Sequence, residues 1–138
     1  MKIVSRIKNS KGQQEVTLQT SDNQHSLPIP ARSSGPGSSV NGGELLFLAL
    51  ATCYCNDIYR EAAKRGITVE SVAVEVEGEF GAEGEPARNV TYRARVAARG
   101  AENQIRDLMV YTDTVTEIQN TLRTAASVTL VAIEPVPV

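Results

Sequence analysis

The sequence predicts an α+β fold in which antiparallel sheets accompany one long helix. Three observations support this: polar and apolar residues alternate with period two in two separate regions, one segment of about six turns reads as a helix, and the order is strands, long helix, strands, helices, strand. The chain has 138 residues, of which 41% are hydrophobic, so we expect residues 1–138 to form a single domain.

The first twenty residues predict a β-hairpin. Residues 2–8 and 15–20 carry strand-like alternation, and Asn9-Ser10-Lys11-Gly12 between them is rich in turn-forming residues. Residues 21–43 then contain several prolines and glycines, which exclude a helix or a central strand there. We expect residues 31–43 to form a long loop, and His25, in this polar stretch, to be a solvated loop residue.

Residues 44–65 predict a helix that stops at Gly66, with Lys64 and Arg65 in its last turn. The first half of the segment, LLFLALATCYC, is apolar on every face. One small sheet covers only one side of such a helix. We therefore expect a second subunit to cover the other side.

The middle of the chain predicts a second hairpin with its turn near Gly84. Residues 72–80 alternate between Val or Phe and a row of glutamates, and residues 90–96 between apolar residues and arginines. The glutamate row then faces the arginine row on a solvated surface. Beyond it, residues 100–111 and 115–123 predict helices, and residues 127–133 predict a final strand.

Composition excludes several classes of partner. A net charge of −2, 4% aromatic residues and no Trp give no basis for binding nucleic acid or anionic lipid. One histidine and two cysteines are too few for an ordinary zinc site, so we expect no metal and no cofactor. The N-terminus lacks a signal-peptide core, and the apolar run at 45–55 is too short to span a membrane. A reducing cytoplasm fits best.

The two cysteines differ in their surroundings. On a helix, residues two apart point about 200° from each other, so Cys53 and Cys55 cannot form an intrachain disulfide. Cys55 shares an apolar face and reads as a packing residue. Cys53 lies where an apolar stripe becomes polar, which suits a reactive thiol, although burial alone would also explain it. Asp57 one turn on would raise the pKa of Cys53, so a thiolate needs a cation from elsewhere, such as Arg32 or Arg6.

The segment from Asn41 to Cys53 resembles the helix motif of the OsmC/Ohr family, the osmotically inducible and organic hydroperoxide resistance proteins. The motif is a Gly/Asn stretch leading into Glu-Leu-Leu, a run of small residues and a cysteine. The alternating strand after Val69 and the terminal helix–strand unit also match. The resemblance implies an intertwined homodimer in which antiparallel sheets wrap two long central helices. It also implies that the Cys53 thiolate attacks an organic hydroperoxide and becomes a sulfenic acid.

Two departures from the family pattern affect the chemistry. The second cysteine of the family begins a Cys-Pro motif in the late helix, and Thr116-Glu117 stands there. The family glutamate that helps to orient the activating arginine falls at or next to Gly43, with Glu44 one residue along. Two hypotheses follow. The first is a homodimeric peroxidase with one thiol, reduced by an external thiol. The second is a non-catalytic member that binds a small apolar ligand in the cleft between subunits, with Cys53 structural.

Overall fold

The computed structural model describes residues 1–138, which divide into two compact units, Met1–Leu46 and Phe47–Val138. The antiparallel sheets and three helices confirm the predicted α+β class. No helix is both long and apolar enough to cross a membrane. That residues 1–138 make a single domain stays a prediction.

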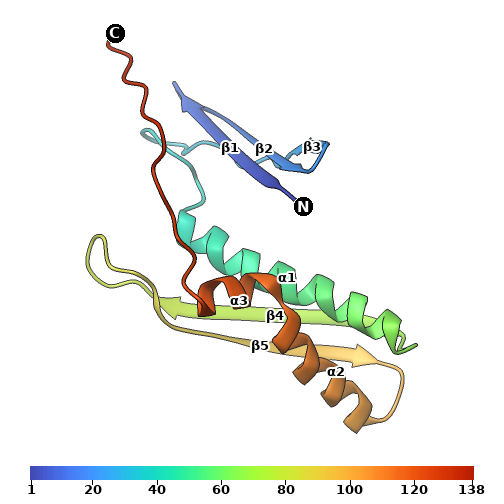
Figure 1. The fold of residues 1–138 in the computed structure, drawn as a ribbon. Helices are drawn as coiled ribbons and strands as arrows, with labels where there is room; N and C mark the ends of the chain where they lie inside the picture. Colours follow the sequence, from blue (N-terminus) through green and yellow to red (C-terminus); the bar gives the residue numbers. More distant parts are fainter. The chain divides into compact units, whose positions relative to one another are not determined.

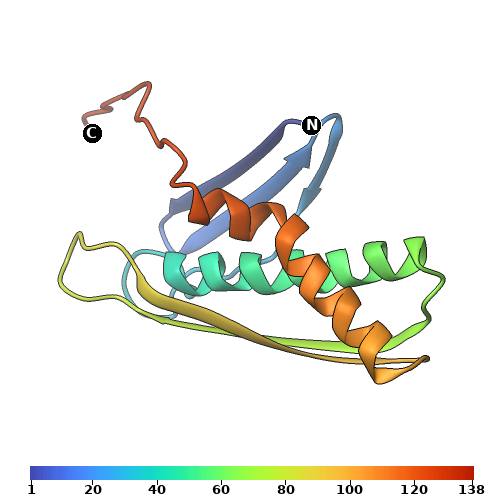
Figure 2. The same ribbon diagram turned by 60° about the horizontal axis from the view of Figure 1, so that its bottom comes forward.

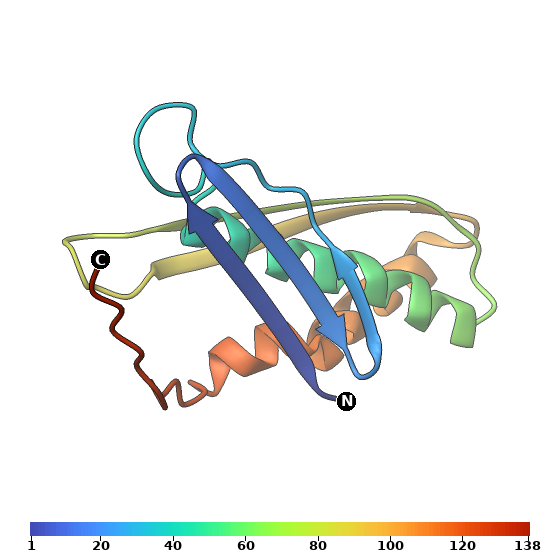
Figure 3. The ribbon, with the colours of Figure 1, turned by 90° about the horizontal axis from the view of Figure 1, so that it is seen from above.

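The N-terminal unit is a three-stranded antiparallel sheet in the order β1-β2-β3 (Figure 3). Strands β1 (Ile3–Ser10) and β2 (Gln13–Thr20) form the predicted hairpin. Its two turn residues, Lys11 and Gly12, both have positive φ, as the tightest hairpin turns require.

The third strand, β3 (Asn23–Ser26), was not predicted. It carries only polar side chains, so no hydrophobic alternation marks it, and it lies at the sheet edge, where backbone pairing with β2 is sufficient. His25 is exposed, as expected, but lies on this strand and not in a loop.

The predicted loop follows β3 and is held by side-chain amides from the sheet. Gln14 Nε2 donates to Ile29 O and to Ser38 Oγ, both at 3.0 Å, and Asn9 Nδ2 donates to Gly37 O at 3.1 Å. These contacts give the long loop a defined path.

Helix α1 (Gly42–Lys64) matches the predicted helix to within two residues at each end. It begins with a reciprocal cap, in which Glu44 N–H donates to Asn41 Oδ1 at 2.8 Å and Asn41 N–H donates to Glu44 Oε1 at 3.1 Å. Its C-terminus is capped just beyond Lys64, where Gly66 has φ 65° and Ile67 N–H donates to Ala62 O at 2.9 Å.

Strands β4 (Val69–Glu79) and β5 (Arg88–Ala98) form the second predicted hairpin. Its outer face carries charge pairs between the predicted rows, with Arg93 lying 2.9 Å from Glu77 and 3.5 Å from Glu75. Its inner face supplies Val72, Val74, Tyr92, Ala94 and Val96 to the core. Phe80, predicted to point inward, is 53% exposed and stacks on Phe47 instead.

Two helices pack on the inner face of this hairpin (Figures 1 and 2). Tyr54, Ile58 and Ala62 of α1 form the core with Leu108 of α2 (Glu102–Val115). Helix α3 (Glu117–Arg123) follows α2 after Thr116. Both late helices were predicted: the ends of α2 differ from the prediction by two and four residues, and α3 starts two residues later but ends at Arg123 as predicted.

The predicted final strand at residues 127–133 is wrong for this chain. Residues beyond Thr124 form neither helix nor strand apart from a turn, and Val128 is 96% exposed. The segment alternates as a strand does, but a strand needs a neighbour to accept its hydrogen bonds, and no strand of the chain pairs with it.

Candidate functional site

Cys53 is half-buried on α1, where the N-terminus of α3 approaches it. Ile118, in the first turn of α3, donates a backbone N–H to the Cys53 sulfur. Asp57, one helical turn along α1, places Oδ2 at 3.6 Å from Cys53 Sγ. Glu117 of α3 places Oε2 at 3.8 Å from the same sulfur. Two carboxylates from different helices therefore face one thiol.

The Cys53 thiol is held in its protonated form by these surroundings. Burial raises the pKa of Cys53, the charges of Asp57 and Glu117 raise it further, and the Ile118 N–H opposes them. The net direction is upward. The sequence had indicated that Asp57 would act this way, and the structure adds Glu117 in the same direction.

The pKa values of Asp57 and Glu117 are shifted in opposite directions. Burial and the nearby Glu117 charge raise the pKa of Asp57. A hydrogen bond from its own backbone, together with the Arg60 charge, lowers the pKa of Glu117. A proton shared by the pair therefore resides on Asp57 up to a higher pH than on Glu117.

Arg60 is the cation that binds this carboxyl pair. Its Nη1 lies 2.9 Å from Asp57 Oδ1 and 3.3 Å from Glu117 Oε1, and its Nε lies 3.0 Å from Glu61 Oε1. The guanidinium therefore pairs only with carboxylates. It binds Asp57 Oδ1 and Glu117 Oε1, while the other oxygen of each carboxylate lies near the sulfur.

Cys53, Asp57 and Glu117 are also the residues that could hold a metal. Their sulfur and carboxylate oxygens lie within 4.8 Å of one another, a donor set that a divalent ion such as zinc can use. Arg60 already supplies a positive charge to both carboxylates. The absence of a bound metal stays a prediction.

Thr116 occupies the position that the resemblance assigns to a second cysteine. It is fully buried, it precedes α3, and its Oγ1 donates to Asp113 O at 3.0 Å. A second contact fastens α3 to α1, because Gln119 Nε2 donates to Leu50 O at 3.0 Å. Thr116 therefore shapes the α2–α3 junction and offers no sulfur to Cys53.

Cys55 is half-buried and not part of the core. It borders a small cavity of about 250 Å³ together with Ala51, Thr52, Asn56 and Val74. Like Cys53 it is a free thiol.

The other candidate residues lie in the N-terminal unit. Arg6 is on β1 and donates to Gln19 Oε1 at 3.3 Å, and Arg32 is in the long loop, where its Nε donates to Ser38 O at 3.2 Å. Glu44 caps α1. These three residues belong to the unit Met1–Leu46 and Cys53 to the unit Phe47–Val138, and their roles beside Cys53 stay predictions.

Sequence reasoning missed Glu117 and Arg60 as members of the site. For Glu117 a signal was available in the family resemblance. In the family, the second cysteine of the late helix must come close to the first, so residues at that position should lie near Cys53. The register of the late helix placed Thr116-Glu117 there.

Comparison with known proteins supports the resemblance. The model of the family described as OsmC-like protein matches residues 35–131. No curated protein sequence matches the chain. An OsmC-like protein from Mycoplasma pneumoniae has a similar structure, with TM-score 0.62, 16% identity and coverage of 90% of this chain and 87% of that one.

Two further solved structures are similar to the chain. An organic hydroperoxide resistance protein OsmC from Legionella pneumophila has TM-score 0.51, 21% identity and coverage of 87% and 89%. An OsmC-like hydroperoxide resistance protein from Jannaschia has TM-score 0.55, 14% identity and coverage of 91% and 89%. At these identities the structures show a shared fold alone. The family match extends over more than half of the chain, which therefore belongs to the OsmC-like family.

Proposed function

We propose that this protein reduces organic hydroperoxides with the single thiol of Cys53, and that the Asp57–Glu117 pair moves the proton. One observation carries the proposal: two carboxylates from different helices lie 3.6 and 3.8 Å from the Cys53 sulfur. The chain's family and two solved structures of similar fold, both of hydroperoxide resistance proteins, support the choice of substrate.

The chemical step balances with these groups. The Cys53 S–H proton passes to a carboxylate of the pair, and the sulfur attacks the terminal oxygen of the hydroperoxide. An S–O bond forms, the O–O bond breaks, and its electron pair leaves with the alkoxide. The carboxyl group returns the proton to the alkoxide, giving an alcohol and a Cys53 sulfenic acid. Sulfur loses two electrons and the peroxide gains them.

The raised pKa of Cys53 explains why the step needs a base. A thiol whose pKa is raised is mostly protonated at neutral pH, so attack requires that its proton be removed as the S–O bond forms. Either carboxylate is placed to accept this proton, because Asp57 Oδ2 lies 3.6 Å and Glu117 Oε2 lies 3.8 Å from Cys53 Sγ. The Ile118 N–H, which already donates to the sulfur, stabilises the sulfur as it becomes negative.

An external thiol completes the cycle. One reductant thiol condenses with the sulfenic acid, giving a mixed disulfide and water, and a second thiol releases Cys53 and leaves as the oxidised reductant. The chain's other cysteine, Cys55, points to a different side of α1 and Thr116 carries no sulfur, so we place no intrachain disulfide in the cycle.

We further propose that the active form is a cytoplasmic homodimer. Leu48 and Tyr59 lie on one face of α1 and are 59% and 46% exposed. The apolar segment 127–133 lacks a strand partner within the chain. A second copy would cover both features, and Arg6, Arg32 or Glu44 of the N-terminal unit would then be candidates to act beside Cys53.

The test is to trap the sulfenic acid. The purified protein is treated with cumene hydroperoxide and dimedone, and the adduct is located by mass spectrometry. We expect an adduct at Cys53, and peroxide consumption supported by an added thiol. Cys53→Ser abolishes both, whereas the matched Cys55→Ser variant retains them. No adduct at Cys53, or unchanged consumption in Cys53→Ser, would refute the proposal.

A further inference from the structure

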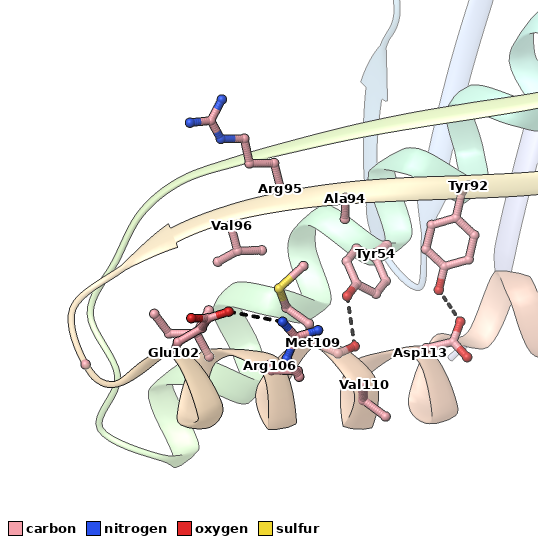
Figure 4. A pocket seen from close by; sticks show the side chains of 12 residues that line it. Tyr54, Tyr92, Ala94, Arg95, Val96, Glu102, Arg106, Met109, Val110 and Asp113 are labelled. Carbon is pink, nitrogen blue, oxygen red and sulfur yellow. Dashed lines mark hydrogen bonds and ion pairs between the residues drawn. The ribbon is translucent and has the colours of Figure 1, made fainter.

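A cavity of about 810 Å³ lies between β5 and α2, apart from the Cys53 cluster (Figure 4). Its walls are Ala94 and Val96 of β5 and Ile105 and Met109 of α2, and Tyr54 of α1 also borders it. The volume is typical of sites for small organic molecules.

The two tyrosines present ring surface to the cavity and no free hydroxyl. Tyr54 and Tyr92 pack edge to face, with ring centres 5.1 Å apart. Tyr54 Oη donates to Met109 O at 2.8 Å, and Tyr92 Oη donates to Asp113 Oδ1. Because both hydroxyls are engaged, the wall offers carbon and sulfur contacts to an occupant.

Both acidic groups at the cavity, Asp113 and Glu102, pair with arginines of the chain, whereas Arg95 forms no ion pair. Arg123 Nη2 lies 2.7 Å from Asp113 Oδ1, and Arg106 Nη2 lies 3.1 Å from Glu102 Oε1. The side chain of Arg95 points away from α2 (Figure 4). Burial raises the pKa of Tyr54 to about 12, and burial with the Asp113 bond raises the pKa of Tyr92, so both phenols are neutral.

We propose that this cavity is a binding site for a small, neutral, apolar molecule, aromatic or branched. An ionised ligand would lose its hydration without gaining a countercharge that is both unpaired and turned toward α2. The site lies within one chain, not in a cleft between subunits, and it does not depend on the chemistry of Cys53.

The test compares two fluorescent probes of nearly the same shape. N-phenylnaphthylamine is neutral, and anilinonaphthalenesulfonate carries a sulfonate. We expect the neutral probe to bind one site per chain, at least tenfold more tightly than the anionic probe. Ala94→Phe fills the cavity and weakens binding of the neutral probe at least tenfold. Ala97→Phe adds the same ring to the exposed outer face of β5 and leaves binding unchanged.

A second variant guards against misfolding of Ala94→Phe. Ile105→Glu places a carboxylate at the half-buried wall of the cavity, and we expect it to weaken binding of the neutral probe at least tenfold. Circular dichroism checks that each variant is folded. The proposal is overturned if the folded protein does not bind the neutral probe, or if both probes bind equally. It is also overturned if the folded wall variants bind like Ala97→Phe, since the probe then binds other apolar surface.

Discussion

At the residue scale, the reactivity of Cys53 is set by two carboxylates and one backbone amide around its sulfur. Asp57 and Glu117 disfavour the thiolate, and the Ile118 N–H favours it. Burial acts in the same direction as the carboxylates, so the protonated thiol dominates. The site is therefore suited to proton transfer during attack and unsuited to storing a thiolate.

The raised pKa predicts the pH profile of Cys53 alkylation. In a Cys55→Ser background, we expect the rate with iodoacetamide to rise with pH and reach half its maximum above the ordinary cysteine value of about 8.5. The same thiol in the urea-unfolded chain is the control for solvent access. A midpoint below that of the unfolded chain would mean that a cation activates Cys53.

At the element scale, the β4–β5 hairpin depends on a close approach at Gly78. A Cβ atom at this position would lie 2.7 Å from Phe47 Cζ and 3.1 Å from Val90 Cγ2. We expect Gly78→Ala to lower the free energy of unfolding by about 1–2 kcal/mol, because overpacking outweighs the gain in backbone entropy.

Gly42→Ala is the matched control in a urea titration. Nothing lies within 4 Å of a Cβ at Gly42, which begins α1, so this variant should be neutral or slightly stabilising. Equal stability of the two variants would contradict the described packing of Phe47.

The junction of α2 and α3 is joined to β5 by Asp113. Tyr92 and Arg123 both donate to its carboxylate, and Arg123 also donates to Asp113 O. Although burial acts to raise it, these bonds lower the pKa of Asp113. The stabilisation is thus present above about pH 4 and is lost as the pH falls through the folded-state pKa.

Asp113→Asn should therefore destabilise the protein at pH 7 by about 1 kcal/mol, a small figure because the group is partly exposed. The difference from wild type should shrink below about pH 4. Asp107→Asn, at an exposed position of α2, is the control. If the difference in unfolding free energy between wild type and Asp113→Asn does not change with pH, the charge of Asp113 does not contribute to stability.

The sequence predicted those elements whose stability is local. Both hairpins, α1 and the two late helices follow from period, capping residues and turn residues such as Lys11-Gly12 and Gly84. It did not predict β3, whose polar residues lack a pattern, and it predicted a strand at 127–133 that has no neighbour in this chain. Strand formation depends on a partner that no local pattern supplies.

The candidate site was predicted only where its residues are close in the sequence. Cys53 and Asp57 lie one turn apart on α1, so their proximity follows from helix geometry. Glu117 is distant in sequence, and its approach depends on how α3 packs against α1. The cavity beside Tyr54 likewise arises from tertiary packing.

At the scale of the whole molecule, the exposed face of α1 predicts a homodimer. We expect wild type to sediment at twice the 14.8 kDa mass of one chain at micromolar concentration. Leu48→Glu should shift it toward monomer, because a charge would replace an exposed leucine on that face. Val110→Glu, at an exposed position of α2, should not. A compact wild-type monomer would contradict the dimer.

The central claim is that the carboxyl pair moves the Cys53 proton during peroxide reduction. Glu117→Gln tests it most directly, since Glu117 is exposed and its loss should leave the fold intact. Two rates are measured at pH 7 in a Cys55→Ser background: alkylation by iodoacetamide and oxidation by cumene hydroperoxide. Glu102→Gln, in the first turn of α2, is the matched control.

Removing the Glu117 charge lowers the Cys53 pKa, so alkylation should become faster. Peroxide oxidation should become slower, because only Asp57 is left to take the Cys53 proton and return it to the alkoxide. The ratio of the oxidation rate to the alkylation rate should therefore fall by about 10- to 100-fold. If both rates rise together in Glu117→Gln, the carboxylates only suppress the thiolate, and the proposed proton transfer is wrong.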